Sequence, residues 1–156
     1  MLKNKKQGFT LIEMLVVVAI IGMLGSLIFG GLISSSRAKA RDAKRISDMA
    51  NLQSVMELYY NKYGYYPVGK ITEYTSSADW GNFTAILTDP MTGVGISKLP
   101  KDPVATKSYM YSRSDDQQDY VLGAKLENKD QTMENSIEGS IYGISCGTDM
   151  LYCVKP

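Results

Sequence analysis

At 156 residues the chain is long enough for one ordinary domain and too short for two, and any membrane segment must be subtracted before its core is judged. The formal net charge is +1, so no strong basic field favours nucleic acid, and the lack of histidine excludes histidine-based triads and histidine metal ligands. Hydrophobic residues make up 44% of the sequence, as in a soluble protein, but they are concentrated in one N-terminal block.

That block, residues 9–33, predicts a transmembrane helix. Its sequence is FTLIEMLVVVAIIGMLGSLIFGGLI, with Glu13 as the only charged residue. About 25 residues at about 1.5 Å each span about 37 Å, enough to cross a bilayer with some tilt. A buried helix of a soluble protein fits less well because the run has no polar face. A cleaved secretory signal is the second alternative, but the run is longer than usual and lacks an A-x-A-like exit.

A second helical segment, residues 34–63, follows without Gly or Pro. Gly64 suits a helix C-cap, and Pro67 prevents the helix from resuming. Residues 9–63 are therefore expected to form one nearly continuous helix about 80 Å long. Its second half is amphipathic, because apolar residues recur every three or four positions: Ala43, Ile46, Met49, Leu52 or Gln53, Met56, Tyr59 or Tyr60, and Tyr63.

The remaining residues, 64–156, supply elements that can cover this apolar stripe. SADWGNFTAILTD predicts a short helix, and KSYMYSR and DYVLGAKLE flank the polar stretch SDDQQ in a hairpin pattern. IYGIS and LYCV are weaker strand predictions, and NKDQTMENSIEG is expected to be a surface connection. The predicted fold class is α+β: a long N-terminal helix, its first half transmembrane and its second half packed on a small antiparallel β-sheet.

The two cysteines, Cys146 and Cys153, lie near the C-terminus. An even count in an exported chain favours a disulfide-closed loop, with a pair of free thiols as the alternative. A zinc site or a CxxC redox motif does not fit, because the spacing is wrong and no further Cys or His is present.

The N-terminus, KNKKQGFTLIEMLVVVAIIGMLGSL, carries the most specific pattern. A basic leader ends at Gly8, and Phe9 to Glu13 follow as FTLIE. This pattern closely resembles the class III signal of type IV pilins, type II secretion pseudopilins and competence pilins. The resemblance implies cytoplasmic cleavage between Gly8 and Phe9 by a prepilin peptidase, N-methylation of Phe9, and assembly through the N-terminal helices. Gly8 suits a narrow protease cleft because it has no Cβ.

Glu13 requires a partner, because a carboxylate at the centre of a membrane helix costs about 2.5 to 3.5 kcal/mol, although less near an end. In this family the natural partner is the new α-amine of Phe9 on an adjacent subunit, an ion pair that would help set the register. The alternative is that Glu13 only reaches the head-group layer.

Basic residues after the apolar run complicate the orientation. Three lysines precede it, but five cations follow within RAKARDAKR, so the positive-inside rule alone would favour the opposite orientation. The pilin resemblance places that stretch beyond the outer face of the membrane. Nucleic-acid binding there is not favoured, because acidic residues interrupt it and no aromatic residues interleave. Intersubunit salt bridges or contact with lipid head groups are the expected roles.

Segments in the C-terminal half resemble two different branches of the superfamily, the pseudopilins and the type IV pilins. NKYGYYP and LPKDP resemble segments of major pseudopilins of type II secretion, although the usual Trp-Gly-Asn continuation and the late acidic calcium loop are missing. The loop closed by Cys146 and Cys153 instead resembles the C-terminal region of type IV pilins. The nearest group of calcium-ligand candidates is Asp115, Asp116 and Asp119, which are expected mainly to solvate a hairpin loop because the EF-hand spacing is absent.

The predicted function is that of a structural subunit of a type IV pilus-like filament, not an enzyme, with no cofactor. A type II secretion major pseudopilin and a membrane-anchored binding domain that never polymerises are the alternatives, and an anchored hydrolase lacks both His and GxSxG. Expected partners are further copies of the chain, minor pilins or pseudopilins, the peptidase and methyltransferase, a membrane platform protein and an assembly ATPase.

The expected location is the cytoplasmic membrane, with a single pass and a cytoplasmic N-terminus, and later a periplasmic or cell-surface filament. Four parts are expected along the chain. Residues 1–8 are a leader that is removed, residues 9–33 are the transmembrane and filament-core half of the helix, and residues 34–63 are its amphipathic half. Residues 64–156 form a head with an αβ-loop, a sheet and the disulfide loop.

Overall fold

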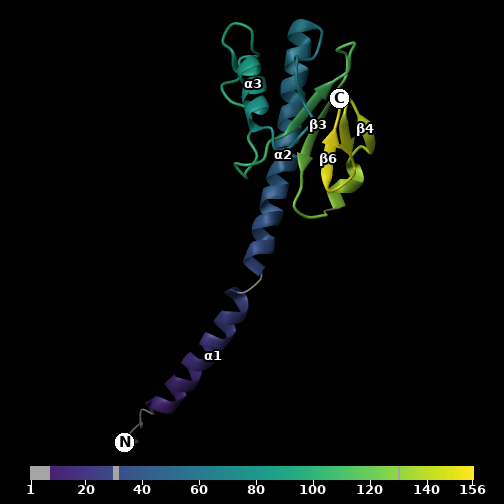
Figure 1. Ribbon diagram of the computed structural model, residues 1–156. Coiled ribbons are helices and arrows are strands. Elements are labelled where there is room, and N and C mark those ends of the chain that lie inside the picture. Colours follow the sequence, from purple (N-terminus) through teal and green to yellow (C-terminus); the bar gives the residue numbers. More distant parts are fainter. Residues whose placement is uncertain (1–7, 30–31, 130) are drawn as a thin grey trace, which may run out of the picture. The chain divides into compact units, whose positions relative to one another are not determined.

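The computed structural model describes residues 8–29, 32–129 and 131–156 (Figure 1). The chain forms two compact units, residues 1–37 and residues 38–156. The predicted leader, residues 1–8, lies outside the described residues except for Gly8.

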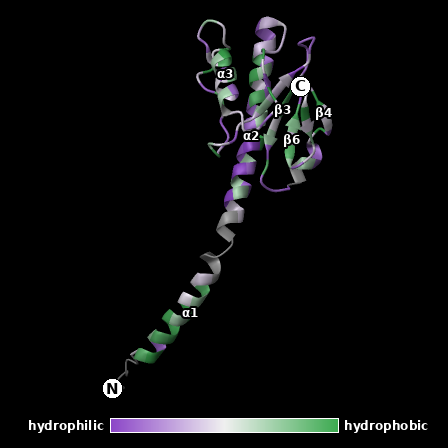
Figure 2. Cartoon of the chain, in the orientation of Figure 1, coloured by the Kyte–Doolittle hydropathy of each residue, from purple (hydrophilic) through white to green (hydrophobic). Residues whose placement is uncertain are grey.

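The first unit contains α1 (Leu11–Phe29), a helix of 19 residues. Hydrophobic residues dominate this helix (Figure 2). Many of its hydrophobic side chains are exposed to solvent, for example Leu11 at 82% and Met23 at 74%. In the ranges that the structure describes, no helix is both long and apolar enough to cross a membrane. The predicted transmembrane span, residues 9–33, includes residues 30 and 31, which lie outside the described residues. The prediction of one continuous helix over residues 9–63 also depends on these two residues.

Helix α2 (Leu32–Tyr63) ends where the sequence predicts. Gly64 adopts a positive φ of 75° and donates its N–H to the Tyr60 carbonyl at 2.7 Å, so the left-handed residue closes the helix. The buried stripe of α2 follows the predicted spacing through Met49, Leu52 and Met56. Ala43 is exposed, so the stripe starts later than expected.

A four-stranded antiparallel sheet lies in the second unit, in the order β1-β2-β3-β6. Its strands are β1 (Lys70–Ile71), β2 (Met110–Arg113), β3 (Tyr120–Lys125) and β6 (Leu151–Val154). The predicted hairpin is confirmed as β2–β3, with Ser112 opposite Val121. The α+β class is likewise confirmed.

The predicted strand IYGIS is wrong, because it is a hairpin in itself. It joins β4 (Gly139–Ile141) to β5 (Ile144–Cys146) in a second, two-stranded sheet. Tyr142 and Gly143 between them have φ values of 47° and 89°, the left-handed pair that a tight two-residue turn requires. The expected surface connection before it includes a short 3-10 helix, η1 (Gln131–Asn135).

Helix α3 (Ser77–Thr88) confirms the predicted short helix. Its aromatic residues pack on the sheet: the Phe83 and Tyr111 rings stack with centroids 4.4 Å apart, and Trp80 meets Tyr109 edge to face at 5.5 Å. With Leu52 of α2 these residues belong to one hydrophobic core. The head is therefore held together by contacts among α2, α3 and the sheet.

Candidate assembly site and the contacts that support the head

A capping box starts α1. The Thr10 backbone N–H and hydroxyl both donate to Glu13 Oε2 at 2.8 Å, and Glu13 N–H donates to Thr10 Oγ1 at 3.4 Å. This reciprocal arrangement satisfies backbone donors that a helix N-terminus otherwise leaves unpaired. Thr10 is absent from the predicted site, although Thr-x-x-Glu ahead of an apolar run is the sequence signature of such a box.

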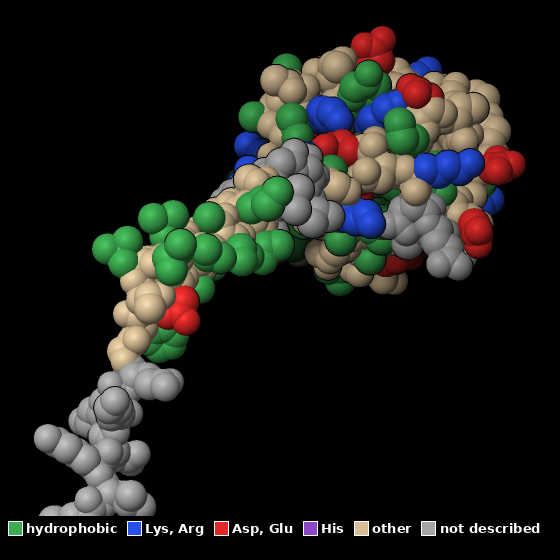
Figure 3. Space-filling model, turned by 90° about the horizontal axis from the view of Figure 1, so that it is seen from below, with side chains coloured by type: hydrophobic (Ala, Val, Ile, Leu, Met, Phe, Trp, Pro, Cys, Tyr) green, Lys and Arg blue, Asp and Glu red, His purple; other side chains and the backbone are tan. Residues whose placement is uncertain are grey.

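Gly8 and Phe9 precede the helix in irregular, exposed backbone, and the Phe9 side chain is 79% exposed. Their peptide bond is therefore accessible in this conformation. Glu13 is exposed too, and both bonds from Thr10 reach a single carboxylate oxygen. Figure 3 shows hydrophobic side chains over α1, interrupted by acidic atoms near its start. A charged group lies at the beginning of an otherwise apolar surface.

Three of the five cations in the basic stretch after the apolar run, Arg41, Lys44 and Arg45, form ion pairs within the second unit. Arg45 is 0% exposed and its Nε and Nη2 donate to the two oxygens of Asp102 at 2.7 and 2.9 Å. Its Nη1 donates to Asp42 and to Glu127, each at 2.8 Å. Burial opposes the charge of the guanidinium, but hydrogen bonds to Asp102, Glu127 and Asp42 outweigh burial and raise the pKa of Arg45.

The neighbouring charges are paired as well. Arg41 donates to Glu127, and this bond is the main cause that lowers the Glu127 pKa from 4.5 to about 2. Lys44 contacts Asp48 at 2.7 Å. Arg45 is fully buried, so the expected contacts with another subunit or with lipid head groups are wrong for this residue. For the other cations of the stretch, those contacts stay a prediction.

The three calcium-ligand candidates are not gathered around one point. Asp116 accepts hydrogen bonds from Ser114 Oγ at 2.5 Å and from the Gln118 N–H at 3.1 Å, whereas Asp119 Oδ2 accepts from Tyr142 Oη at 2.8 Å. Among the described residues, no group of three or more His, Cys, Asp or Glu side chains is placed to hold a metal ion. The interpretation that Asp115, Asp116 and Asp119 mainly solvate the hairpin loop stays a prediction.

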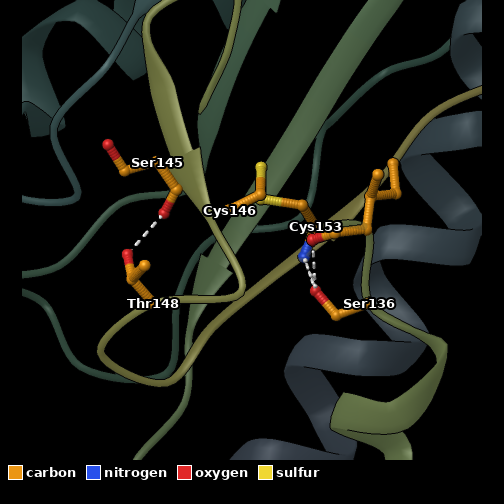
Figure 4. The surroundings of a disulfide bond; sticks show 6 residues. Ser136, Ser145, Cys146, Thr148 and Cys153 are labelled. Atoms are coloured by element: carbon orange, nitrogen blue, oxygen red, sulfur yellow. Dashed lines mark hydrogen bonds between the residues drawn. A yellow bond between two sulfur atoms is a disulfide. The ribbon is translucent and has the colours of Figure 1, made fainter. Parts of the chain in front are cut away.

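The predicted disulfide between Cys146 and Cys153 is confirmed, with Cα atoms 5.7 Å apart (Figure 4). It ties β5 of the small sheet to β6 of the main sheet. The Cys153 N–H donates to Ser136 Oγ at 3.0 Å, and Thr148 Oγ1 donates to the Ser145 carbonyl at 2.9 Å. The disulfide loop is therefore anchored to both sheets and to the segment that precedes β4.

An exposed Gly-Phe junction before a capped apolar helix, with an α+β head behind it, defines the type IV pilin and pseudopilin superfamily. The model of the prokaryotic N-terminal methylation motif matches residues 3–29. The chain is 33% identical to the type II secretion system core protein G of Aeromonas hydrophila over 115 residues, which are 72% of this chain and 77% of that protein. It belongs to the family of that protein.

Two other members of the family are similar over shorter stretches. The core protein G of Pectobacterium carotovorum is 32% identical over 65% of this chain and 64% of its own length. That of Vibrio cholerae is 32% identical over 64% of this chain and 66% of its own length. No solved structure matches the chain. These relatives are named as components of a secretion system, in agreement with a structural role, and they favour the pseudopilin alternative over the pilus.

Proposed function

We propose that the chain is a pseudopilin: a processed subunit that polymerises with its own copies and with other pseudopilins in a type II secretion system. The observation that carries the proposal is the similarity to core protein G, which extends over 72% of the chain and so includes the head as well as the methylation motif. The subunit waits in the cytoplasmic membrane, and the assembled filament lies in the periplasm.

The geometry at the N-terminus supports processing before assembly. The Gly8–Phe9 bond lies in irregular exposed backbone, where a prepilin peptidase can reach it. Cleavage converts the Phe9 nitrogen into an amine, which a methyltransferase modifies. Thr10 holds Glu13 through Oε2 within the subunit, and the α-amine of an adjacent subunit neutralises the carboxylate on assembly. The capping box thus orients the Glu13 carboxylate before the α-amine of the adjacent subunit binds it.

Substitution of Glu13 by Gln tests this function. It removes the charge and keeps the side-chain shape, so filaments and secretion are expected to be lost while membrane insertion and cleavage after Gly8 persist. Mass spectrometry of the mature N-terminus checks cleavage and methylation of Phe9. Glu134→Gln is the matched control, because Glu134 is exposed in the head and distant in sequence. Normal filaments from the Glu13→Gln chain would refute assembly through this carboxylate and favour a binding domain that does not polymerise.

A type IV pilus subunit is the second candidate, and the disulfide between Cys146 and Cys153 favours it. Deletion of the gene in its own host distinguishes the pseudopilin from the pilus subunit. Loss of exported proteins from the medium, with surface filaments unchanged, supports the pseudopilin. Loss of surface filaments with normal secretion would support the pilus. The membrane platform protein and the assembly ATPase are common to both proposals.

A further inference from the structure

The head contains a hollow that the proposed assembly does not use. It has a volume of about 330 Å³, which lies within the range of small-ligand sites, about 300 to 1,000 Å³. Three segments line it: residues 72–75 after β1, the turn before β5 at Gly143, and the disulfide loop at Thr148 and Asp149. We call it the sheet hollow, because Met110 of β2 and Leu151 of β6 also line it.

Tyr74 provides the accessible aromatic surface of the sheet hollow. Met110 and Leu151 are only 4% and 7% exposed, so they support the hollow but offer little surface to a ligand. Tyr74 is 37% exposed, and the Lys125 ammonium lies 5.5 Å from the centre of its ring. This cation–π contact orients the ring. An oriented and accessible ring can pack against the apolar face of a ligand.

The accessible polar groups of the sheet hollow are mainly hydroxyls. Thr75, Ser145 and Thr148 are all exposed. Thr148 donates its hydroxyl to the Ser145 carbonyl at 2.9 Å (Figure 4), which leaves the lone pairs of the hydroxyl oxygen as acceptors. Glu73 is exposed as well, and its carboxylate offers two acceptor oxygens. The hollow thus presents both donors and acceptors to a ligand.

The charges of the sheet hollow do not favour an anion. Lys125 supplies the cation of the lining, but its ammonium already contacts the Asp149 carboxylate and backbone carbonyl as well as the Tyr74 ring. No ion pair within the described ranges involves Glu73. With Lys125 at +1 and Glu73 and Asp149 at -1 each, the net charge of the lining is -1.

The disulfide loop holds its side of the sheet hollow in a strained backbone conformation. Asp149 and Met150 have left-handed φ values of 50° and 59°, which are unusual for residues other than glycine. Such strain persists where the surrounding structure enforces it, often around ligand sites. Here the Leu151 N–H donates to the Thr148 carbonyl at 2.9 Å, and the disulfide closes the loop. This side of the hollow is therefore preorganised, which lowers the cost of binding.

We propose that the sheet hollow binds a neutral pyranose sugar. One C–H face of the sugar ring packs against Tyr74, and its hydroxyls bond to Glu73, Ser145 and Thr148. Sugar hydroxyls donate and accept, as the groups of the hollow do, and a neutral ligand agrees with a lining that already pairs its one ammonium. A β-glucopyranoside suits the site best, because its equatorial hydroxyls leave C–H groups on both faces of the ring.

Saturation-transfer-difference NMR on the full chain tests this proposal. The detergent is a polyoxyethylene ether, which has no sugar head group, and the probe is methyl β-D-glucopyranoside. Saturable transfer with a Kd of about 1 mM is expected, strongest at the C–H protons of one ring face. Sorbitol, a polyol without a ring, and ethylammonium, a simple cation, should give no saturable transfer.

Two variants locate the binding. Tyr74→Ala should weaken it about tenfold or more, while Tyr65→Ala, at a tyrosine of similar exposure outside the hollow, leaves it unchanged. Alanine keeps the Tyr74 carbonyl that accepts from the Ser108 N–H at 2.6 Å, so the fold should persist, and urea midpoints check this. Glu73→Gln should weaken binding about fivefold, with Glu134→Gln as its unchanged control.

Several results would overturn the proposal. They are a lack of saturable transfer to the glucoside, an equal response to sorbitol, or unchanged binding by both Tyr74→Ala and Glu73→Gln. Saturable binding of ethylammonium in place of the glucoside would also overturn it and would identify a cation site at Glu73. If Tyr74→Ala unfolds, Glu73→Gln decides alone, because its side chain is exposed and its replacement leaves the packing of the head intact.

Discussion

Arg45 illustrates how one side chain connects distant segments of the head. Its partners Asp102 and Glu127 lie 57 and 82 positions further along the chain, and the guanidinium that joins them is fully buried. A buried ion pair of this kind is weak evidence for stability by itself, because desolvation offsets much of the attraction. Removing Arg45 is different, since the Asp42 and Asp102 carboxylates then stay buried without an ion-pair partner.

Arg45→Met is therefore expected to lower the free energy of unfolding by about 3 to 5 kcal/mol. Urea unfolding of the full chain in non-ionic detergent, followed by Trp80 fluorescence, measures the loss. Arg37→Met is the control: Arg37 is exposed, and its replacement should change stability by less than about 0.5 kcal/mol. Equal stability of the two variants would show that the buried network contributes nothing to the fold.

Glu127 gives the head a predictable response to acid. The hydrogen bond from Arg41 is the main cause that lowers its pKa from 4.5 to about 2, so the folded state prefers the ionised form. The resulting stabilisation is complete above about pH 4.5 and is lost as the pH falls toward 2, because the unfolded chain binds the proton first. Glu127→Gln should flatten the decline of unfolding free energy in this window. Urea midpoints measured at several pH values test it, and a variant that declines as steeply as the native chain contradicts it.

At the scale of elements, the disulfide joins two sheets that also share a small hydrophobic cluster, which includes Met110 of β2 and Ile144 of β5. Cys146 of β5 and Cys153 of β6 are both buried, at 1% and 0% exposed, and they close a short loop. Such a loop restricts the unfolded chain and contributes about 2 to 3 kcal/mol by chain entropy. The stabilisation should be concentrated in β4, β5 and β6.

Replacement of both cysteines by serine should accordingly lower the unfolding free energy by about 2 to 3 kcal/mol. Hydrogen exchange is expected to accelerate in β4–β6, while the β2–β3 hairpin keeps its protection. A reducing agent should reproduce the loss in the native chain and have no effect on the double variant. Uniform acceleration across both sheets would mean that the disulfide supports the head as one cooperative unit.

Elements with local signals could be predicted from the sequence. The end of α2 follows from Gly64 and Pro67, and the β2–β3 hairpin follows from two apolar segments around SDDQQ. The turn within IYGIS has only a weak local signal, because a positive φ at Tyr142 is unusual for a bulky residue and Gly143 alone marks the turn. The partners of Arg45 had no local signal at all. Periodicity identifies which face of a helix is buried, but not which distant loop supplies the counter-charge.

On the scale of the whole molecule, the two compact units carry different parts of the proposed function. The capping box and the exposed apolar surface of α1 lie within residues 1–37. Two hydrophobic clusters, the core around Leu52 and the smaller cluster around Met110 and Ile144, are built from residues after Ala38. The N-terminal unit therefore carries the residues that the proposed assembly uses. The disulfide loop and the ion-pair network around Arg45 belong to the other unit.

A chain of residues 38–156 should consequently fold alone. It retains every member of both clusters, the disulfide and the network around Arg45. We expect it to be monomeric without detergent and to show an unfolding free energy within about 0.5 kcal/mol of the head in the full chain, measured by urea unfolding with Trp80 fluorescence. It should form no filaments, because Phe9 and Glu13 are absent. If the fragment unfolds or loses more than about 2 kcal/mol, residues before Ala38 contribute to the head, and the two units are thermodynamically coupled.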